Sequence, residues 1–278
     1  MILSRLLYYL SSLPTLLGGV RHWPGVARAL LRPRRPPFVV ELKDGTRLTV
    51  RTPLDVWIVK ETCLERQYER ASVTIEDGWT VLDIGAGLGD FAISVARRCP
   101  RSAVIACEPF PPSFALLEEN IRLNGVANVR PLPCALGERV GTVAFPVAAI
   151  EAVQQSTMAP PDAARETVAV ASVTLEHLLA QEGISRCDYV KMDCEGAEYG
   201  ILFATDPATL RRIRHICLEV HEGVTEYSRH DLVRFFERNG FRVRLTPNPA
   251  WRHLALLHAA GDGDPKRSAR TPAPTAPR

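Results

Sequence analysis

Residues 81–94 read VLDIGAGLGDFAIS, and this stretch decides the fold class of the 278-residue chain. An apolar run typical of a buried strand ends at Asp83 and is followed by Gly85, Gly87 and Gly89, after which a helix-compatible sequence begins. A strand, a glycine turn and a helix N-terminus bring backbone N–H groups close to a bound ligand. The stretch therefore predicts a nucleotide pocket.

The spacing of the glycines separates the cofactor classes. A dinucleotide pattern, G-x-G-x-x-G, needs its third glycine three positions after the second, where Asp90 stands. The pattern present is D-x-G-x-G-x-G, which is typical of doubly wound methyltransferases that use S-adenosylmethionine. A nicotinamide oxidoreductase is disfavoured by this spacing and by the lack of a hydride-transfer constellation.

The next predicted strand ends in a carboxylate. Residues 102–110 read SAVIACEPF, so Glu108 lies at the strand end, before Pro109 breaks the run. A carboxylate about 20 residues past the glycines suits two adjacent ribose hydroxyls, because its two oxygens accept both hydrogen bonds at once. The alternative is a solvated carboxylate at a strand end.

Further stretches carry a family resemblance. They are ACEPFPPSFALLEENIRLNGVANVRPLPCALG from residue 106, DYVKMDCEGAEYGIL from residue 188 and ICLEVH from residue 216. With residues 81–94 they resemble the FkbM family of methyltransferases over roughly residues 39–259, most specifically in KMDCEGAE. The family commonly has Asn where Gly87 stands, so any contact of that side chain is missing or replaced here. The resemblance implies transfer of a methyl group from S-adenosylmethionine to a hydroxyl of a sugar, polyketide or other small metabolite.

The alternation of strand and helix patterns predicts an α/β fold. We expect the doubly wound, Rossmann-like fold of class I methyltransferases, with a mostly parallel seven-stranded sheet and an antiparallel closing strand. Helices are predicted at 54–68 and 231–239. Later strands are predicted at 128–135, 188–193 and 216–220, with a closing antiparallel pair at 241–245 and 253–258.

The chain divides into four expected parts. Residues 1–37 form an apolar or amphipathic segment with a proline-rich linker, and residues 38–70 a hairpin and helix that cap the core. Residues 71–260 are the methyltransferase domain, and residues 261–278 are expected to be disordered because they are rich in Pro, Gly and charge. Within the domain, residues 141–167 read either as a substrate-side lid or as an ordinary surface loop.

Composition narrows the partners and the compartment. The net charge is +3 and the arginines are scattered, so the sequence shows no basic stripe of the kind that binds nucleic acid. The seven cysteines include no C-x-x-C pair, and we expect them to be reduced thiols of a cytoplasmic protein. The apolar N-terminus is interrupted by Arg5 and Pro14. It predicts a helix that packs on the domain or lies on a membrane surface, in preference to a signal peptide cleaved after Ala29.

Titratable residues follow the fourth and fifth predicted strands. Asp193 and Glu195 end one strand, whereas Glu219 and His221 share one face of the next, because side-chain direction repeats every second residue. We expect these four side chains to converge and to be catalytic. The predicted general base is His221, taken as neutral near pH 7, or Glu195, with Asp193 orienting the hydroxyl or the donor's ammonium group.

The resemblance also aligns Glu61 and Tyr68, on the helix predicted at 54–68, with the entry segment of the family. The cofactor site is predicted to comprise residues of the glycine loop, the strand ends and this entry helix: Asp83, Gly85, Ala86, Gly87, Gly89, Glu108, Pro109, Ala135 and Tyr68. Several alternatives remain open. Glu219 can instead form an ion pair with Lys191, and the acidic cluster can hold Mg²⁺, although no metal motif matches and no metal is predicted. N-methylation, a lipid acceptor and a non-catalytic binding module also remain.

Overall fold

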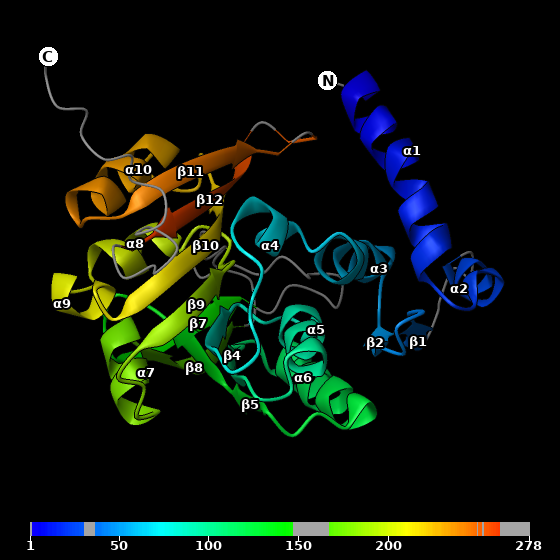
Figure 1. Ribbon diagram of the computed structural model, residues 1–278, viewed down its shortest axis with the longest axis horizontal. Helices are drawn as coiled ribbons and strands as arrows, with labels where there is room; N and C mark the ends of the chain where they lie inside the picture. The colour runs from blue at the N-terminus through cyan, green and yellow to red at the C-terminus, as the bar shows by residue number, and fades with distance from the viewer. Residues whose placement is uncertain (1, 31–36, 147–166, 249, 252, 262–278) are drawn as a thin grey trace, which may run out of the picture.

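The computed structural model describes residues 2–30, 37–146, 167–248, 250–251 and 253–261 (Figure 1). Its centre is a seven-stranded sheet with the order β11-β12-β10-β9-β3-β4-β5. β12 runs antiparallel to both of its neighbours, and the five strands from β10 to β5 run parallel. The predicted fold class, with its closing antiparallel pair, is confirmed. The strands are β3 (Thr80–Ile84), β4 (Ala103–Cys107), β5 (Val129–Leu132), β9 (Cys187–Met192), β10 (Ile213–His221), β11 (Arg242–Pro247) and β12 (Leu254–Ala260).

Helices cover both faces of this sheet (Figure 1). One face packs against α5 (Asp90–Arg98) and α6 (Pro111–Asn124), with Phe91 and Leu117 in the apolar core. The other face packs against a second group of helices, with Leu178 and Phe236 in its core. That group is α7 (Leu175–Gln181), α8 (Glu198–Phe203), α9 (Pro207–Leu210) and α10 (Arg229–Arg238).

The third predicted strand, 128–135, is not a single strand. β5 ends at Leu132, and after Pro133 the chain leaves the main sheet as β6 (Cys134–Leu136), which pairs in parallel with β8 (Thr167–Val173). Proline has no N–H to donate to a ladder, which explains the break. β7 (Gly141–Pro146) completes this small sheet, and residues 147–166 of the predicted lid lie outside the described residues.

The single helix predicted at 54–68 is also wrong. The chain forms α3 (Pro53–Val59), a π-helical turn η1 (Lys60–Leu64) and α4 (Gln67–Ala71). Arg66 has a φ of 48°, a left-handed conformation that ends the helical run. Short π-helical turns occur frequently at functional sites.

The N-terminal region packs on the domain. The hairpin β1 (Phe38–Glu41) and β2 (Arg47–Val50) is tied to α6, because the Thr49 N–H donates to Asn120 Oδ1 at 2.7 Å. Leu16 and Val20 of the N-terminal region are buried in the same apolar cluster as the hairpin residue Leu42. The helices are α1 (Ile2–Gly19) and α2 (Trp23–Leu30), and α1 runs along the outer side of α3 (Figure 1).

The second half of α1 therefore packs on the domain, which is one of the two arrangements predicted for the N-terminal segment. Leu13 and Leu17 of the same helix are exposed, and contact of this side with a membrane surface stays a prediction. Among the described helices, none is both long enough and apolar enough to cross a membrane.

Candidate active site

A cavity of about 480 Å³ opens at the carboxyl ends of β3, β4, β9 and β10. Ligands bind at this edge of open α/β sheets, where strand order reverses. Among the predicted cofactor residues, seven line the cavity: Tyr68, Gly85, Ala86, Gly87, Glu108, Pro109 and Ala135. All four predicted catalytic residues, Asp193, Glu195, Glu219 and His221, line it as well.

The glycine loop fits tightly against the neighbouring strand end. Gly85 has a φ of 74°, and a Cβ there would stand 1.9 Å from the carbonyl oxygen of Asp193. Gly87 has a φ of 56°, and a Cβ there would meet no heavy atom within 4 Å among the described residues. Of these two glycines, Gly85 requires the absence of a side chain for packing, whereas Gly87 borders open space in which a ligand can lie.

Glu108 fastens the loop to the end of β4. Its Oε2 accepts a hydrogen bond from the Gly87 N–H at 2.7 Å, and its Oε1 accepts one from the Phe110 N–H at 2.9 Å. Burial raises the pKa of this carboxyl to about 7. Each oxygen keeps a second lone pair, so the side chain can still accept from a ribose diol in the cavity.

Asp83 and Gly89, also predicted as cofactor residues, are not among the cavity-lining residues. Asp83 is fully buried at the end of β3, where Lys191 Nζ lies 3.0 Å from its Oδ1. Gly89 instead precedes α5, where a Cβ would stand 2.5 Å from Leu117 Cδ1. Their placement supports roles in packing and loop position rather than direct contact with a cofactor.

The suggested ion pair between Lys191 and Glu219 is replaced by the pair with Asp83. The Lys191 ammonium also donates to the carbonyl oxygen of Gly85 at 2.6 Å. A buried charge requires a partner and hydrogen bonds, and this lysine has both. Lys191 therefore links β9 to the glycine loop. This role was not predicted from the sequence.

A tight turn after β9 places Glu195. The Glu198 carboxylate, which is fully buried, accepts the Cys194 N–H at 2.7 Å through Oε1 and the Gly196 N–H at 2.8 Å through Oε2. Glu195 has a φ of 52°, which is uncommon outside glycine. Strained conformations of this kind cluster at functional sites, where the surrounding structure holds them.

His221 lies inside a ring of carboxylates. Its Nε2 is 3.3 Å from Glu195 Oε2 and 3.9 Å from Asp193 Oδ1, while its Nδ1 is 3.3 Å from Glu198 Oε1. Burial alone lowers the pKa of His221, but the hydrogen bond to Glu198 and the surrounding negative charges outweigh it and raise the pKa to about 10.

This value corrects the prediction of a neutral His221 in the free protein. At pH 7 the ring is a cation with a proton on each nitrogen, so it holds no free lone pair with which to accept another proton. Glu198 is the principal cause, and it stands within the quoted block KMDCEGAE without having been assigned a role there.

The other acids of the cluster hold protons more tightly than usual. Burial and the charge of Asp193 raise the pKa of Glu195 to about 7 and that of Glu219 to about 8. The Tyr68 hydroxyl donates to Asp193 Oδ2 at 2.9 Å, which fixes that carboxylate. The carboxylates of the cluster have few positively charged partners, so they repel one another. The positive charge of a sulfonium methyl donor would reduce this repulsion.

Asp193, Glu219 and His221 could also hold a divalent cation. One ligand atom from each lies within 4.8 Å of the others. Two carboxylates and an imidazole suit several divalent metals, so the arrangement permits a metal but does not require one.

Other residues that line the cavity were not predicted as site residues. They come from the entry segment and from the region before β12: Trp57, Glu61, Asn248, Trp251 and His253. The only earlier signal was the similarity of the segment containing Glu61 to the family's entry region. The last three are far from any motif, and only the fold brings them to the cavity.

Comparison with known proteins identifies the family. The methyltransferase FkbM domain matches residues 83–243, which is more than half of the chain. The chain belongs to the FkbM methyltransferases. It is 26% identical over 222 residues to the 31-O-demethyl-FK506 methyltransferase FkbM of Streptomyces tacrolimicus, covering 69% of this chain and 84% of that protein.

Two further relatives differ in length. The AMB antimetabolite synthetase AmbE of Pseudomonas aeruginosa is 24% identical over 244 residues, but this match covers 74% of the present chain and only 12% of AmbE. The solved structure of methyltransferase FkbM from Methylobacillus flagellatus is 14% identical with a TM-score of 0.48, covering 73% of this chain and 53% of that one.

As an FkbM methyltransferase, the protein uses S-adenosylmethionine, and its residues fit that molecule. The open space at Gly87 and the Glu108 carboxylate suit the amino-acid and ribose parts, respectively. When bound, S-adenosylmethionine would supply an electrophilic methyl group for transfer to an acceptor.

Proposed function

We propose that this FkbM methyltransferase methylates a hydroxyl oxygen of a small metabolite, such as a sugar or a polyketide. The observation that carries the proposal is the placement of Glu195. Its carboxylate lines the cavity, is 3.3 Å from protonated His221 and belongs to a residue held in the left-handed conformation. Strain of this kind is maintained where the position of a side chain matters.

Methyl transfer is an in-line displacement, so the protein must align the acceptor oxygen with the methyl carbon and remove its proton. A base works best when its pKa is near the working pH, and the pKa of Glu195 is about 7. In this proposal Glu195 accepts the hydroxyl proton as the carbon–oxygen bond forms. His221 donates a hydrogen bond to Glu195 and keeps it oriented.

The relatives support an oxygen acceptor. The similar protein of Streptomyces tacrolimicus is named for methylation of 31-O-demethyl-FK506, and its match covers most of both chains. The lack of a basic stripe in the sequence favours a small-molecule or glycan acceptor over nucleic acid.

The test is transfer of an isotopically labelled methyl group from S-adenosylmethionine to a metabolite extract, followed by mass spectrometry of the labelled products. We expect the label on a hydroxyl oxygen, as a methyl ether. Label found only on nitrogen would overturn the proposal of O-methylation, and cofactor binding without any labelled product would favour a non-catalytic module.

A further inference from the structure

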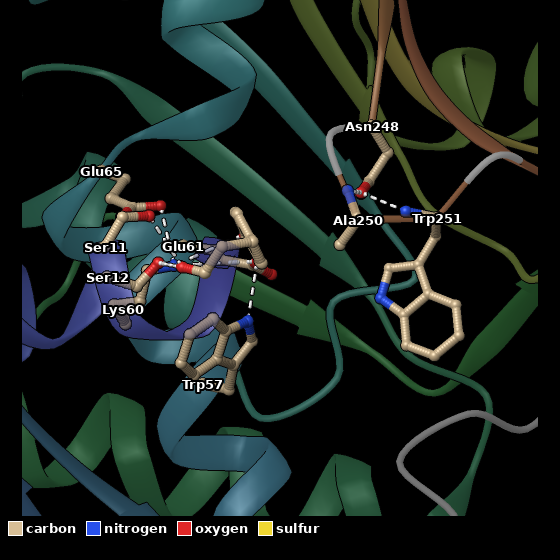
Figure 2. A network of polar contacts seen from close by, with 10 residues as sticks. Ser11, Ser12, Trp57, Lys60, Glu61, Glu65, Asn248, Ala250 and Trp251 are labelled. Carbon is tan, nitrogen blue, oxygen red and sulfur yellow. Dashed lines mark hydrogen bonds and ion pairs between the residues drawn. The ribbon is translucent and has the colours of Figure 1, made fainter. Parts of the chain in front are cut away.

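One wall of the cavity, formed by α3 and η1, combines an indole with a carboxylate. Trp57 on α3 and Glu61 on η1 both line the cavity, and Trp57 Nε1 donates to Glu61 Oε1 at 2.8 Å (Figure 2). The π-helical turn brings Glu61 beside the indole four residues earlier. Neither residue has a part in the methyl-transfer chemistry described above.

The two oxygens of Glu61 have different surroundings. Oε1 accepts hydrogen bonds from Trp57 and from the Tyr8 hydroxyl of α1. Among the described residues, no hydrogen bond or ion pair to Oε2 is found. Because Glu61 lines the cavity, Oε2 is the oxygen left to accept a hydrogen bond from a bound molecule.

A buried lysine packs against the Trp57 indole and connects it to α1. Lys60 is fully buried, and its Nζ lies 4.0 Å from the centre of the Trp57 ring, 3.0 Å from Ser12 Oγ and 3.0 Å from Glu65 Oε2 (Figure 2). Such a cation restrains the indole from one face. Tyr8 and Ser12 both belong to α1, so the N-terminal helix braces the cavity wall.

A second indole lines the same cavity from another part of the chain. Trp251 follows β11, in a turn where Asn248 Oδ1 accepts the N–H groups of Ala250 at 2.9 Å and Trp251 at 3.0 Å (Figure 2). Indoles offer large apolar faces that a saturated ring can cover. The cavity thus has aromatic surface on two segments and a carboxylate oxygen beside one of them.

The charges of the cavity limit what it can accept. Its lining carboxylates outnumber its cations, Arg51, Lys191 and protonated His221, and Lys191 is already paired with buried Asp83. The carboxylates are Glu61, Asp90, Glu108, Asp193, Glu195 and Glu219. At pH 7 Glu219 is largely protonated and Glu108 and Glu195 are about half protonated, so these carboxyl groups can exchange hydrogen bonds with neutral hydroxyls. The described residues that line the cavity have no excess of positive charge to bind a phosphate or carboxylate group.

We propose that Trp57 and Glu61 form the acceptor subsite for a neutral glycosyl ring. The ring covers the exposed part of the Trp57 indole, and one of its hydroxyls donates to Glu61 Oε2 while another is presented to Glu195. Tyr8 is a positioning residue, because it contacts Glu61 and Trp57 but is not among the residues that line the cavity. This assignment rests on the proposed O-methylation and adds the acceptor class and the residues that recognise it.

The first experiment compares acceptors of different charge. Methyl glycosides of glucose, galactose, mannose and rhamnose serve as neutral probes, with glucuronate, glucose 6-phosphate and glucosamine as charged ones. Labelled methyl transfer and saturation-transfer NMR with the demethylated donor product are measured for each. We expect transfer to at least one neutral glycoside and at least tenfold lower kcat/KM for the anionic probes.

The second experiment changes the wall. On the best glycoside, Glu61→Gln should raise KM at least tenfold while kcat and donor Kd stay within about threefold, and Trp57→Leu should act in the same direction. Tyr8→Phe should raise KM less and increase hydrogen exchange over residues 57–64. Ser11→Ala is the control, because Ser11 is exposed and its hydroxyl donates to the Tyr8 carbonyl oxygen, its one hydrogen bond among the described residues.

Several outcomes would overturn the subsite. These are no binding or methylation of any neutral glycoside, equal or better use of an anionic probe, a preference for the amine of glucosamine, or an unchanged KM in both Glu61→Gln and Trp57→Leu. If the metabolite extract still yields a methyl ether in that case, the subsite fails while O-methylation stands. Circular dichroism and donor Kd show that each variant is folded.

Discussion

The donor side and the acceptor side of the cavity are built in different ways. The donor side consists of backbone, glycines and Glu108, drawn from two consecutive strand ends. The acceptor side consists of side chains from several distant segments, among them Trp57, Glu195 and Trp251. The donor side therefore depends on backbone conformation, whereas the acceptor side depends on electrostatics and on packing between residues that are distant in the sequence.

The largest expected effect is on the donor side. Gly85→Ala places a Cβ 1.9 Å from the Asp193 carbonyl oxygen at a φ of 74°, so both sterics and backbone conformation oppose it. We expect a loss of at least ~3 kcal/mol in the free energy of unfolding and no measurable donor binding. Denaturant unfolding and calorimetry with S-adenosylmethionine measure the two effects.

Gly87→Asn is the matched control for this change. Asn tolerates the left-handed conformation and is the residue that the family commonly has at this position, so donor binding should persist. If Gly85→Ala binds the donor with native affinity, donor binding does not depend on the backbone conformation of the glycine loop. The proposed difference between the two sides of the cavity would then be wrong.

The next effect tests the acceptor side. Glu195→Gln should lower turnover by ~10²–10⁴ and leave donor Kd within a few-fold, because the change removes the base but not the donor contacts. Glu226→Gln, an exposed residue beyond β10, should have native activity. Near-native turnover of Glu195→Gln would contradict the base and point to catalysis by alignment alone.

Glu108→Ala should weaken donor binding about tenfold or more. The change removes the predicted ribose hydrogen bonds, each worth roughly 1.5–3 kcal/mol for a charged acceptor, and releases the Gly87 N–H. Glu118→Ala on the exposed side of α6 is the control. Calorimetry measures the Kd of S-adenosylmethionine for both variants. An unchanged Kd in Glu108→Ala would contradict the proposal that Glu108 binds the ribose.

A smaller effect concerns pH. The pKa of Glu219 is raised to about 8 in the folded protein, so between its unfolded value of about 4.5 and pH 8 only the unfolded chain loses the proton. This group therefore lowers stability as pH rises through that window. Glu219→Gln should stabilise the protein at pH 8 by at least ~1 kcal/mol and flatten the decline.

Thermal unfolding of both proteins at pH 5 and pH 8 measures this difference. At pH 5, where the folded wild type still carries the proton, the two should differ little. An identical pH slope for the variant and the wild type would show that Glu219 ionises normally in the folded protein.

The smallest expected effect is that of metal removal. We predict no change in turnover after chelator treatment, although Asp193, Glu219 and His221 lie close enough to share an ion. Loss of turnover with chelator and recovery with Mg²⁺ would show that a divalent cation bound on the acceptor side is needed for turnover.

The fold class and the glycine loop could be predicted from the amino-acid sequence. The glycine spacing, the strand-end position of Glu108 and the alternation of strands with helices are local features, and local backbone geometry follows from local sequence. Even there, Pro133 diverted the third strand and Arg66 ended the entry helix, because the partners of a short segment are chosen by the whole fold.

The protonation of His221, the partner of Lys191 and the wall formed by Trp57 and Glu61 follow from contacts between distant parts of the chain, and the sequence did not predict them. Glu198 raises the pKa of His221 because the turn after β9 brings its carboxylate to 3.3 Å. Lys191 pairs with Asp83 because β9 lies beside β3. Charge interactions depend on distance and burial, and sequence separation specifies neither of these for residues on different strands.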